Sequence, residues 1–450
     1  MVASARSFYV SLWEEHLEEA SALLEQIAAY RHDPTLAWSD LADWELRLRR
    51  RIDALAFGDD LALSVCRRRL TEGDAGEKQA ALRVFCRKRR KDLVYETLER
   101  FGSSEAADLE AMAAALKAEA PAEWHAELAS LLSRHAALAP VLAPLIGERR
   151  LKAETALLAA LPSTPEAKAA AVLVALGRIG GEASLECVAS FARADEPHVS
   201  AAACRAALRL SAGSILEYCL HGVQGRPWLA MPLGLGGGRR AVSVLVSTAG
   251  SAQATDETLI ALGLLGDLSA IRAIFDCLTR ADLAPAAALA LQLITGAELQ
   301  AETFLPDQFS PDELFDEERD CLEATGEWPK RADGQPFGTT VTVPSTDPAV
   351  WRGWLSQNKA RFDPARRYRY GQPYSVRSLL MSLEAERIPN SVRALICDEL
   401  RIRYGVDFPL EIDMPVVEQR RLLVRLREWA AINESKFEPG EWYFHGRRID

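Results

Sequence analysis

The sequence predicts an all-α fold in which pairs of short helices stack into a solenoid. Two observations indicate this: apolar segments that end in glycine recur about every 30 residues, and patterns typical of strands are nearly absent. The recurrence is clearest in AVLVALGRIGG (171–181) and TLIALGLLGD (258–267). A period of this length accommodates two helices, and neither could bury its apolar side alone. Successive pairs must therefore supply the core for one another.

The leucines of these segments define the period. Their separations are 31, 32, 25, 29 and 29 residues, counted over Leu145, Leu176, Leu208, Leu233, Leu262 and Leu291. A second helix fits between successive leucines, as in residues 270–280, where apolar residues recur at helical spacing. Short alanine-rich helices closed by glycine are typical of HEAT-like repeats. A non-repetitive helical bundle is the alternative.

Four regions follow along the chain. Residues 1–72 predict an N-terminal helical hairpin of amphipathic helices, and residues 73–300 hold the HEAT-like repeat array. Residues 301–348 are acidic and rich in turn formers, so we expect an irregular connector, in which TVTV (340–343) could be extended. Residues 349–450 return to helical patterns.

Composition excludes several classes of protein. The chain has 450 residues, of which 49% are hydrophobic and 26% charged, so it is not disordered throughout. A net charge of -11 argues against a general nucleic-acid binder. No apolar run is long enough to span a bilayer, no signal peptide is recognisable at the start, and the eight cysteines are scattered. We expect a soluble cytoplasmic protein with reduced cysteines.

No motif for catalysis, a cofactor or a metal is present, so we expect none of the three. HExxH, CxxC, GxSxG and His-Glu pairs are all missing, and the glycine run at 234–238 lacks the Lys-Ser/Thr of a phosphate-binding loop. The one pair that could ligate a metal is His16 with Glu19. We interpret His16 instead as a core or interface histidine that, with Glu19, could meet a partner.

Partner-binding candidates gather in residues 366–373. Arginine and tyrosine, which are enriched at binding hot spots, lie there beside a glycine and a proline that disfavour a helix. We predict a loop in which Arg367, Tyr368 and Gln372 contact a protein partner, with Trp354 as a further candidate. The alternative is that the tyrosines pack under the C-terminal helices while the arginines cap helix ends.

Three basic clusters lie further toward the N-terminus. They contain Arg47 and Arg49–Arg51, then Arg67–Arg69, then Arg87–Lys91. Acidic residues separate them, so we interpret them as solvated faces or as a docking patch for an acidic partner.

Three stretches resemble one family. They are EEHLEEASALLEQ (14–26) with the following LAWSDLADWELRLRRRIDAL (36–55), then ALALQLITG (288–296), and WRGWLSQNKARFDPARRYRYGQPYS (351–375). Together they are similar to an uncharacterised set of bacterial HEAT-repeat proteins encoded in type VI secretion gene clusters. The resemblance implies an accessory role in secretion and brings no catalytic residues.

We therefore predict a non-enzymatic scaffold or adaptor that binds a secretion component or effector, for example while an effector or spike component is loaded. No membrane contact is expected, and nucleic acid is disfavoured. The alternatives are a DNA-base glycosylase on a HEAT-like fold, which would need a positive groove, and a lyase or chaperone for a bound cofactor.

Overall fold

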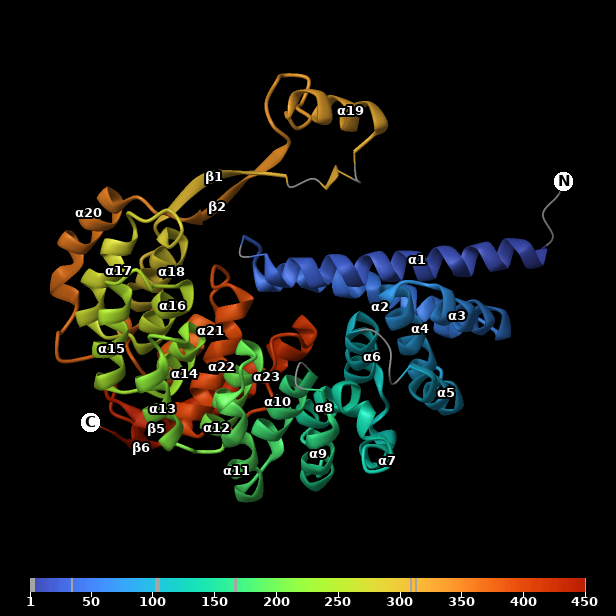
Figure 1. Ribbon diagram of the computed structural model, residues 1–450, viewed down its shortest axis with the longest axis horizontal. Helices are drawn as coiled ribbons and strands as arrows, with labels where there is room; N and C mark the ends of the chain where they lie inside the picture. Colours follow the sequence, from blue (N-terminus) through green and yellow to red (C-terminus); the bar gives the residue numbers. More distant parts are fainter. Residues whose placement is uncertain are drawn as a thin grey trace.

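Helices account for 69% of the chain in the computed structural model, which describes residues 5–33, 35–101, 106–165, 168–307, 310–311 and 314–449. The strands described form three small two-stranded antiparallel sheets. Figure 1 shows the helices stacked along an arc that begins with the N-terminal helices. The predicted all-α, solenoid-like class is confirmed.

Three helices form the N-terminal region: α1 (Ala5–His32), α2 (Leu41–Phe57) and α3 (Asp60–Glu72). The apolar side of α2 is buried at Leu48, Ile52 and Leu55, as expected of an amphipathic helix. On α1, Leu23 and Ile27 are buried, but Phe8 near the start of the helix is 61% exposed. The first turns of α1 extend past the helices that cover the rest of it (Figure 1).

The repeat array has two layers. Even-numbered helices pack one on the next along the concave side of the arc, and odd-numbered helices lie outside them (Figure 1). The six leucines that set the sequence period fall on α8, α10, α12, α14, α16 and α18, and all are fully buried. The array comprises α4 (Ala75–Arg87), α5 (Lys91–Phe101), α6 (Ala106–Glu119), α7 (His125–Leu131), α8 (Ala139–Glu148), α9 (Glu154–Ala160), α10 (Ala169–Ile179), α11 (Glu182–Ser190), α12 (Pro197–Arg209), α13 (Ser214–Gly222), α14 (Ala230–Gly236), α15 (Arg239–Ala249), α16 (Asp256–Leu265), α17 (Ile271–Cys277) and α18 (Ala284–Thr295).

Close contact between glycine and alanine sets the spacing of the inner helices. A Cβ added at Gly177 would lie 2.7 Å from the Cα of Ala206 on the next inner helix, and the same clash occurs at Gly234 against Ala261. Two further pairs repeat the arrangement, Gly147 with Ala175 and Gly263 with Ala290. Neighbouring backbones approach closely because no side chain separates them, which accounts for the alanine and glycine content of the array.

The C-terminal region fills the concave side of the arc. Figure 1 shows α21–α23 inside it, where α22 packs on α12 and α14 while α23 reaches α2. The elements of this region are α20 (Pro348–Asn358), β3 (Tyr368–Arg369), β4 (Gln372–Pro373), α21 (Val376–Glu384), α22 (Asn390–Tyr404), α23 (Val416–Asn433), β5 (Tyr443–Phe444) and β6 (Arg447–Arg448). It therefore contacts the N-terminal region through α23, the middle of the array through α22 and the last helix of the array, α18, through β3.

The stretch expected to be an irregular connector is an arm that projects from the arc (Figure 1). Strands β1 (Gln300–Pro306) and β2 (Gly338–Pro344) pair antiparallel from Gln300↔Pro344 to Pro306↔Gly338. Helix α19 (Asp316–Thr325) lies beyond them. Residues 340–343 are extended in β2, as anticipated, but their partner strand was missed. We call residues 300–344 the arm.

Candidate functional site

Residues 366–373 join the C-terminal region to the array. The Tyr368 amide donates a hydrogen bond to the carbonyl of Gly266 at 2.7 Å, and the Tyr370 amide donates to Leu293 at 2.6 Å. These acceptors lie at the ends of α16 and α18. The β3–β4 hairpin is thus held against the array by main-chain hydrogen bonds.

Arg367 is buried between aromatic rings. Its Cζ lies 3.4 Å from the ring centroid of Tyr374 and 4.2 Å from that of Trp442, and the residue is 1% exposed. Burial lowers the pKa of Arg367 to about 9, with a contribution from the charge of Arg403. Stacking on ring faces compensates in part for the lost hydration of the guanidinium.

The buried carboxylate of Glu399 lies at the centre of this cluster and pairs with Arg369. Glu399 accepts a hydrogen bond from Arg369 Nη2 at 2.6 Å and from the Tyr374 hydroxyl at 2.5 Å, and both members of the ion pair are fully buried. Arg369 also donates to the carbonyl of Leu264, in the last turn of α16, at 2.9 Å. The cluster is therefore an internal joint of the protein.

These contacts correct the predicted partner site. Arg367 and Tyr368 have at most 4% of their surface exposed, so their side chains leave no area for a partner to touch. The alternative interpretation is closer for Arg369, which donates to the end of α16, while Tyr368 is buried edge-on against Phe362, with ring centroids 5.0 Å apart. Gln372 is exposed, and Trp354 is half-buried against Phe362.

Basic side chains along the concave side bind the C-terminal region. Inner helices from α6 to α12 end in, or are followed by, a lysine or arginine that meets an acidic residue between 398 and 413. The ion pairs are Lys117–Asp413, Arg150–Asp407 (3.4 Å), Arg178–Glu411 (2.5 Å) and Arg209–Asp398 (2.6 Å), with Arg205 as a second partner of Asp398. Their charge is thus neutralised within the chain.

Asp398 is the most deeply held of these acidic groups. Burial alone would raise the pKa of its carboxyl group, but Arg205 and Arg209 outweigh burial and lower the pKa to about 2. The carboxylate therefore stays ionised and bound at neutral pH. This part of the concave face, the usual binding surface of a helical solenoid, is occupied by the protein itself.

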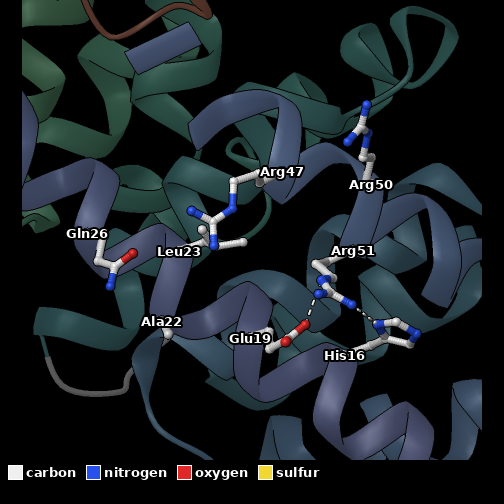
Figure 2. A pocket seen from close by; sticks show the side chains of 8 residues that line it. All are labelled: His16, Glu19, Ala22, Leu23, Gln26, Arg47, Arg50 and Arg51. Atoms are coloured by element: carbon white, nitrogen blue, oxygen red, sulfur yellow. Dashed lines mark hydrogen bonds and ion pairs between the residues drawn. The ribbon is translucent and has the colours of Figure 1, made fainter. Parts of the chain in front are cut away.

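His16 and Glu19 lie together in a cleft between α1 and α2, with a volume of about 500 Å³. Figure 2 shows Arg51 of α2 between them. Its Nε lies 2.5 Å from the Glu19 carboxylate, and its Nη1 donates to His16 Nδ1 at 3.0 Å. Burial lowers the pKa of His16, and the charge of Arg51 lowers it further, so the ring is neutral and can accept this hydrogen bond. Arg51 therefore contacts both of the side chains that the sequence offered as metal ligands.

The same cleft contains two further arginines. Arg47 extends from α2 toward α1 near Leu23, with its Cζ 4.8 Å from the Trp44 ring centroid, and Arg50 stands one turn further along α2 (Figure 2). Within the described part of the chain, no carboxylate pairs with either. Sequence reasoning found the basic cluster but could not separate these two residues from the paired ones.

The arm exposes apolar side chains that the sequence analysis did not select. Phe304 and Leu305 on β1 are 42% and 46% exposed, Phe315 before α19 is 80% exposed, and Trp328 is 45% exposed. The arm also contains eleven acidic and three basic residues, which gives it -8 of the net charge of -11. Its acidic composition and its turn formers predicted an irregular connector, and only the extended stretch TVTV could have indicated a ribbon.

No family model, no curated protein and no solved structure matches the chain. Among the described residues, no group of three or more His, Cys, Asp or Glu side chains is arranged to hold a metal ion. No described helix is long and apolar enough to cross a bilayer.

Proposed function

We propose that this chain is a non-enzymatic protein-binding scaffold and that the arm is its docking element. The observation that carries the proposal is the exposure of apolar side chains on both faces of a projecting β-ribbon. Phe304 and Leu305 are neighbours on β1, so they point to opposite faces of the ribbon, and both are substantially exposed. Exposed apolar groups within a charged surface mark sites of protein interaction.

The filled concave face supports the same proposal. In an open solenoid a partner would bind the inner helices, but here carboxylates of the C-terminal region pair with basic residues of these helices. The same pairing argues against the DNA-base glycosylase, which would need a positive groove free to bind phosphate. A surface outside the arc is the better candidate for a partner.

The resemblance to proteins of type VI secretion clusters supplies the biological setting of the proposal. In that setting the scaffold binds a secretion component or an effector in the cytoplasm, and the partner has an apolar surface rimmed by basic groups, which complement the acidic arm. In addition to the arm, Gln372 and Trp354 remain predicted contacts of the partner.

Affinity capture from the native cell tests the proposal. The tagged protein is compared with a Phe304→Ser/Leu305→Ser variant, and bound proteins are identified by mass spectrometry. Phe57→Ser is the matched control, because Phe57 is 93% exposed but lies at the end of α2, outside the arm. We expect the arm variant to lose a partner that the control retains. Equal capture by all three proteins would contradict the assignment to the arm. A separate gel mobility-shift assay tests binding of duplex DNA, and a shifted band would favour the glycosylase.

A further inference from the structure

The cleft between α1 and α2 has positive charge that no carboxylate of the described residues neutralises. The other basic clusters are paired internally: Arg67 with Glu96, Arg69 with Glu18, and Lys91 with Glu127, for example. Arg51 is paired with Glu19 in the same way. Arg47 and Arg50 differ, since no described carboxylate pairs with them, although the chain as a whole is strongly acidic. Two guanidiniums that lack a described carboxylate partner and lie one helical turn apart on α2 are suited to bind carboxylates.

An acidic counterpart is present on the arm. Glu317, Asp320 and Glu323 are spaced three residues apart on α19, so they lie along one side of the helix. All three are exposed, and no described basic residue pairs with them. None of the residues of α19 is buried. The helix thus presents an acidic side that no basic side chain of the described residues neutralises.

The two surfaces match in spacing and in their apolar neighbours. Arg47 and Arg50 have the i, i+3 spacing of Glu317 and Asp320, which places the Cβ atoms of each pair about 5–6 Å apart. Leu46, next to Arg47, is 45% exposed, and Phe315 precedes the acidic side of α19. We propose that α19 of one copy binds in the α1–α2 cleft of a second copy, with Phe315 against Leu46.

A second copy fits better than closure within one molecule. Seven paired positions between β1 and β2 fix the ribbon, and at its base the Ser345 amide donates to the Leu299 carbonyl at 2.8 Å. In Figure 1, α19 stands clear of α1 and α2. The arm is therefore held away from its own cleft. Exposed ion pairs contribute little individually, so the association is weak and sensitive to salt.

This self-association is separate from the proposed function. It depends on the charged side of α19 and on the α1–α2 cleft, whereas capture of a partner depends on Phe304 and Leu305 of β1. Either one can fail while the other holds.

Sedimentation velocity of the full chain over a wide concentration range tests the proposal. One variant reverses the cleft (Arg47→Glu/Arg50→Glu), and the other reverses the helix (Glu317→Lys/Asp320→Lys). Arg272→Glu and Glu302→Lys are the matched controls, because both residues are exposed and lie outside these two surfaces, Arg272 on α17 and Glu302 on β1. Circular dichroism checks that every variant is folded.

The wild type and both controls should associate at low ionic strength and dissociate at high ionic strength. Each reversal should weaken association at least tenfold, and an equimolar mixture of the two reversed variants should associate again, because the acidic cleft of one then meets the basic helix of the other. A wild type that stays monomeric, an association unaffected by the reversals, or a mixture that does not associate would each overturn the proposal. So would a change in small-angle scattering on reversal without a change in mass, which would indicate closure within one molecule.

Discussion

Replacing Asp398 by asparagine should loosen the C-terminal region from the array. Asn has nearly the same shape but no charge, so the change removes the carboxylate that Arg205 and Arg209 share. The lowering of the pKa of Asp398 from 3.8 to about 2 corresponds to roughly 2 kcal/mol of the free energy of unfolding at neutral pH. Breaking a buried ion pair also leaves a charge without a partner, for which the usual cost is about 3–5 kcal/mol. We expect the Asp398→Asn variant to lose about 3 kcal/mol of the free energy of unfolding.

The stability difference between the wild type and the Asp398→Asn variant should depend on pH in a characteristic way. Because the pKa of Asp398 is lower in the folded state, its contribution is complete above the unfolded value of 3.8 and is lost as the pH falls toward 2. The difference between wild type and variant should therefore be constant from pH 5 to pH 8, a window above that unfolded value, and should shrink below about pH 4.

Hydrogen exchange of the α22 amides, together with the denaturant midpoint, measures the effect locally, since a repeat array need not unfold in one step. Asp407→Asn is the control: Asp407 pairs with Arg150 at 3.4 Å, but its side chain is 52% exposed, so we expect a change below about 1 kcal/mol. Equal effects at both positions, or a difference that does not shrink in acid, would refute the reasoning.

Three further predictions concern other joints of the fold. Gly266→Ala should cost about 1–3 kcal/mol more than Gly326→Ala in thermal unfolding, because both residues have a positive φ but only at Gly266 would the new Cβ meet backbone, 2.1 Å from the Tyr368 oxygen; equal costs would mean that the hairpin yields. Glu399→Ala should lower the free energy of unfolding, measured by urea denaturation, by about 3–5 kcal/mol, because Arg369 stays buried without its carboxylate. An unchanged free energy would show that water enters the cluster and solvates Arg369. Replacing residues 301–343 by a short Gly-Ser linker should leave the unfolding midpoint unchanged, because few described side chains of the arm are buried; a lower midpoint would show that the arm supports the array.

The sequence predicted the array well because its signal is local and repeated. Each of the six leucines belongs to a short helix whose neighbour is the next repeat, so one period gives both the helices and their order. The packing of the C-terminal region against the concave face could not be predicted from such a local signal. The pairing of Asp398 with Arg209 joins residues 189 positions apart, and a single sequence carries no trace of such a contact.

The candidate site shows how composition alone can mislead. Arginine and tyrosine at 367–370 do form an interface, but it lies between two parts of the same chain. Hot-spot composition cannot distinguish an internal joint from an external one, since both bury aromatic rings against guanidiniums. For His16 and Glu19 the sequence correctly placed the two residues near each other, whereas the deciding neighbour, Arg51, comes from the following helix.

The filled concave face has a mechanical consequence. An open solenoid acts as a spring, because each repeat touches only its neighbours and small rotations add up along the array. In this protein the C-terminal region is tied near one end through Glu45, which accepts a hydrogen bond from the Val416 amide, and near the other through Gly266. It therefore acts as a strut that fixes the curvature of the arc. Molecules attached to the arm and to the α1–α2 cleft would be held at a constant separation, so the protein can serve as a rigid spacer between them.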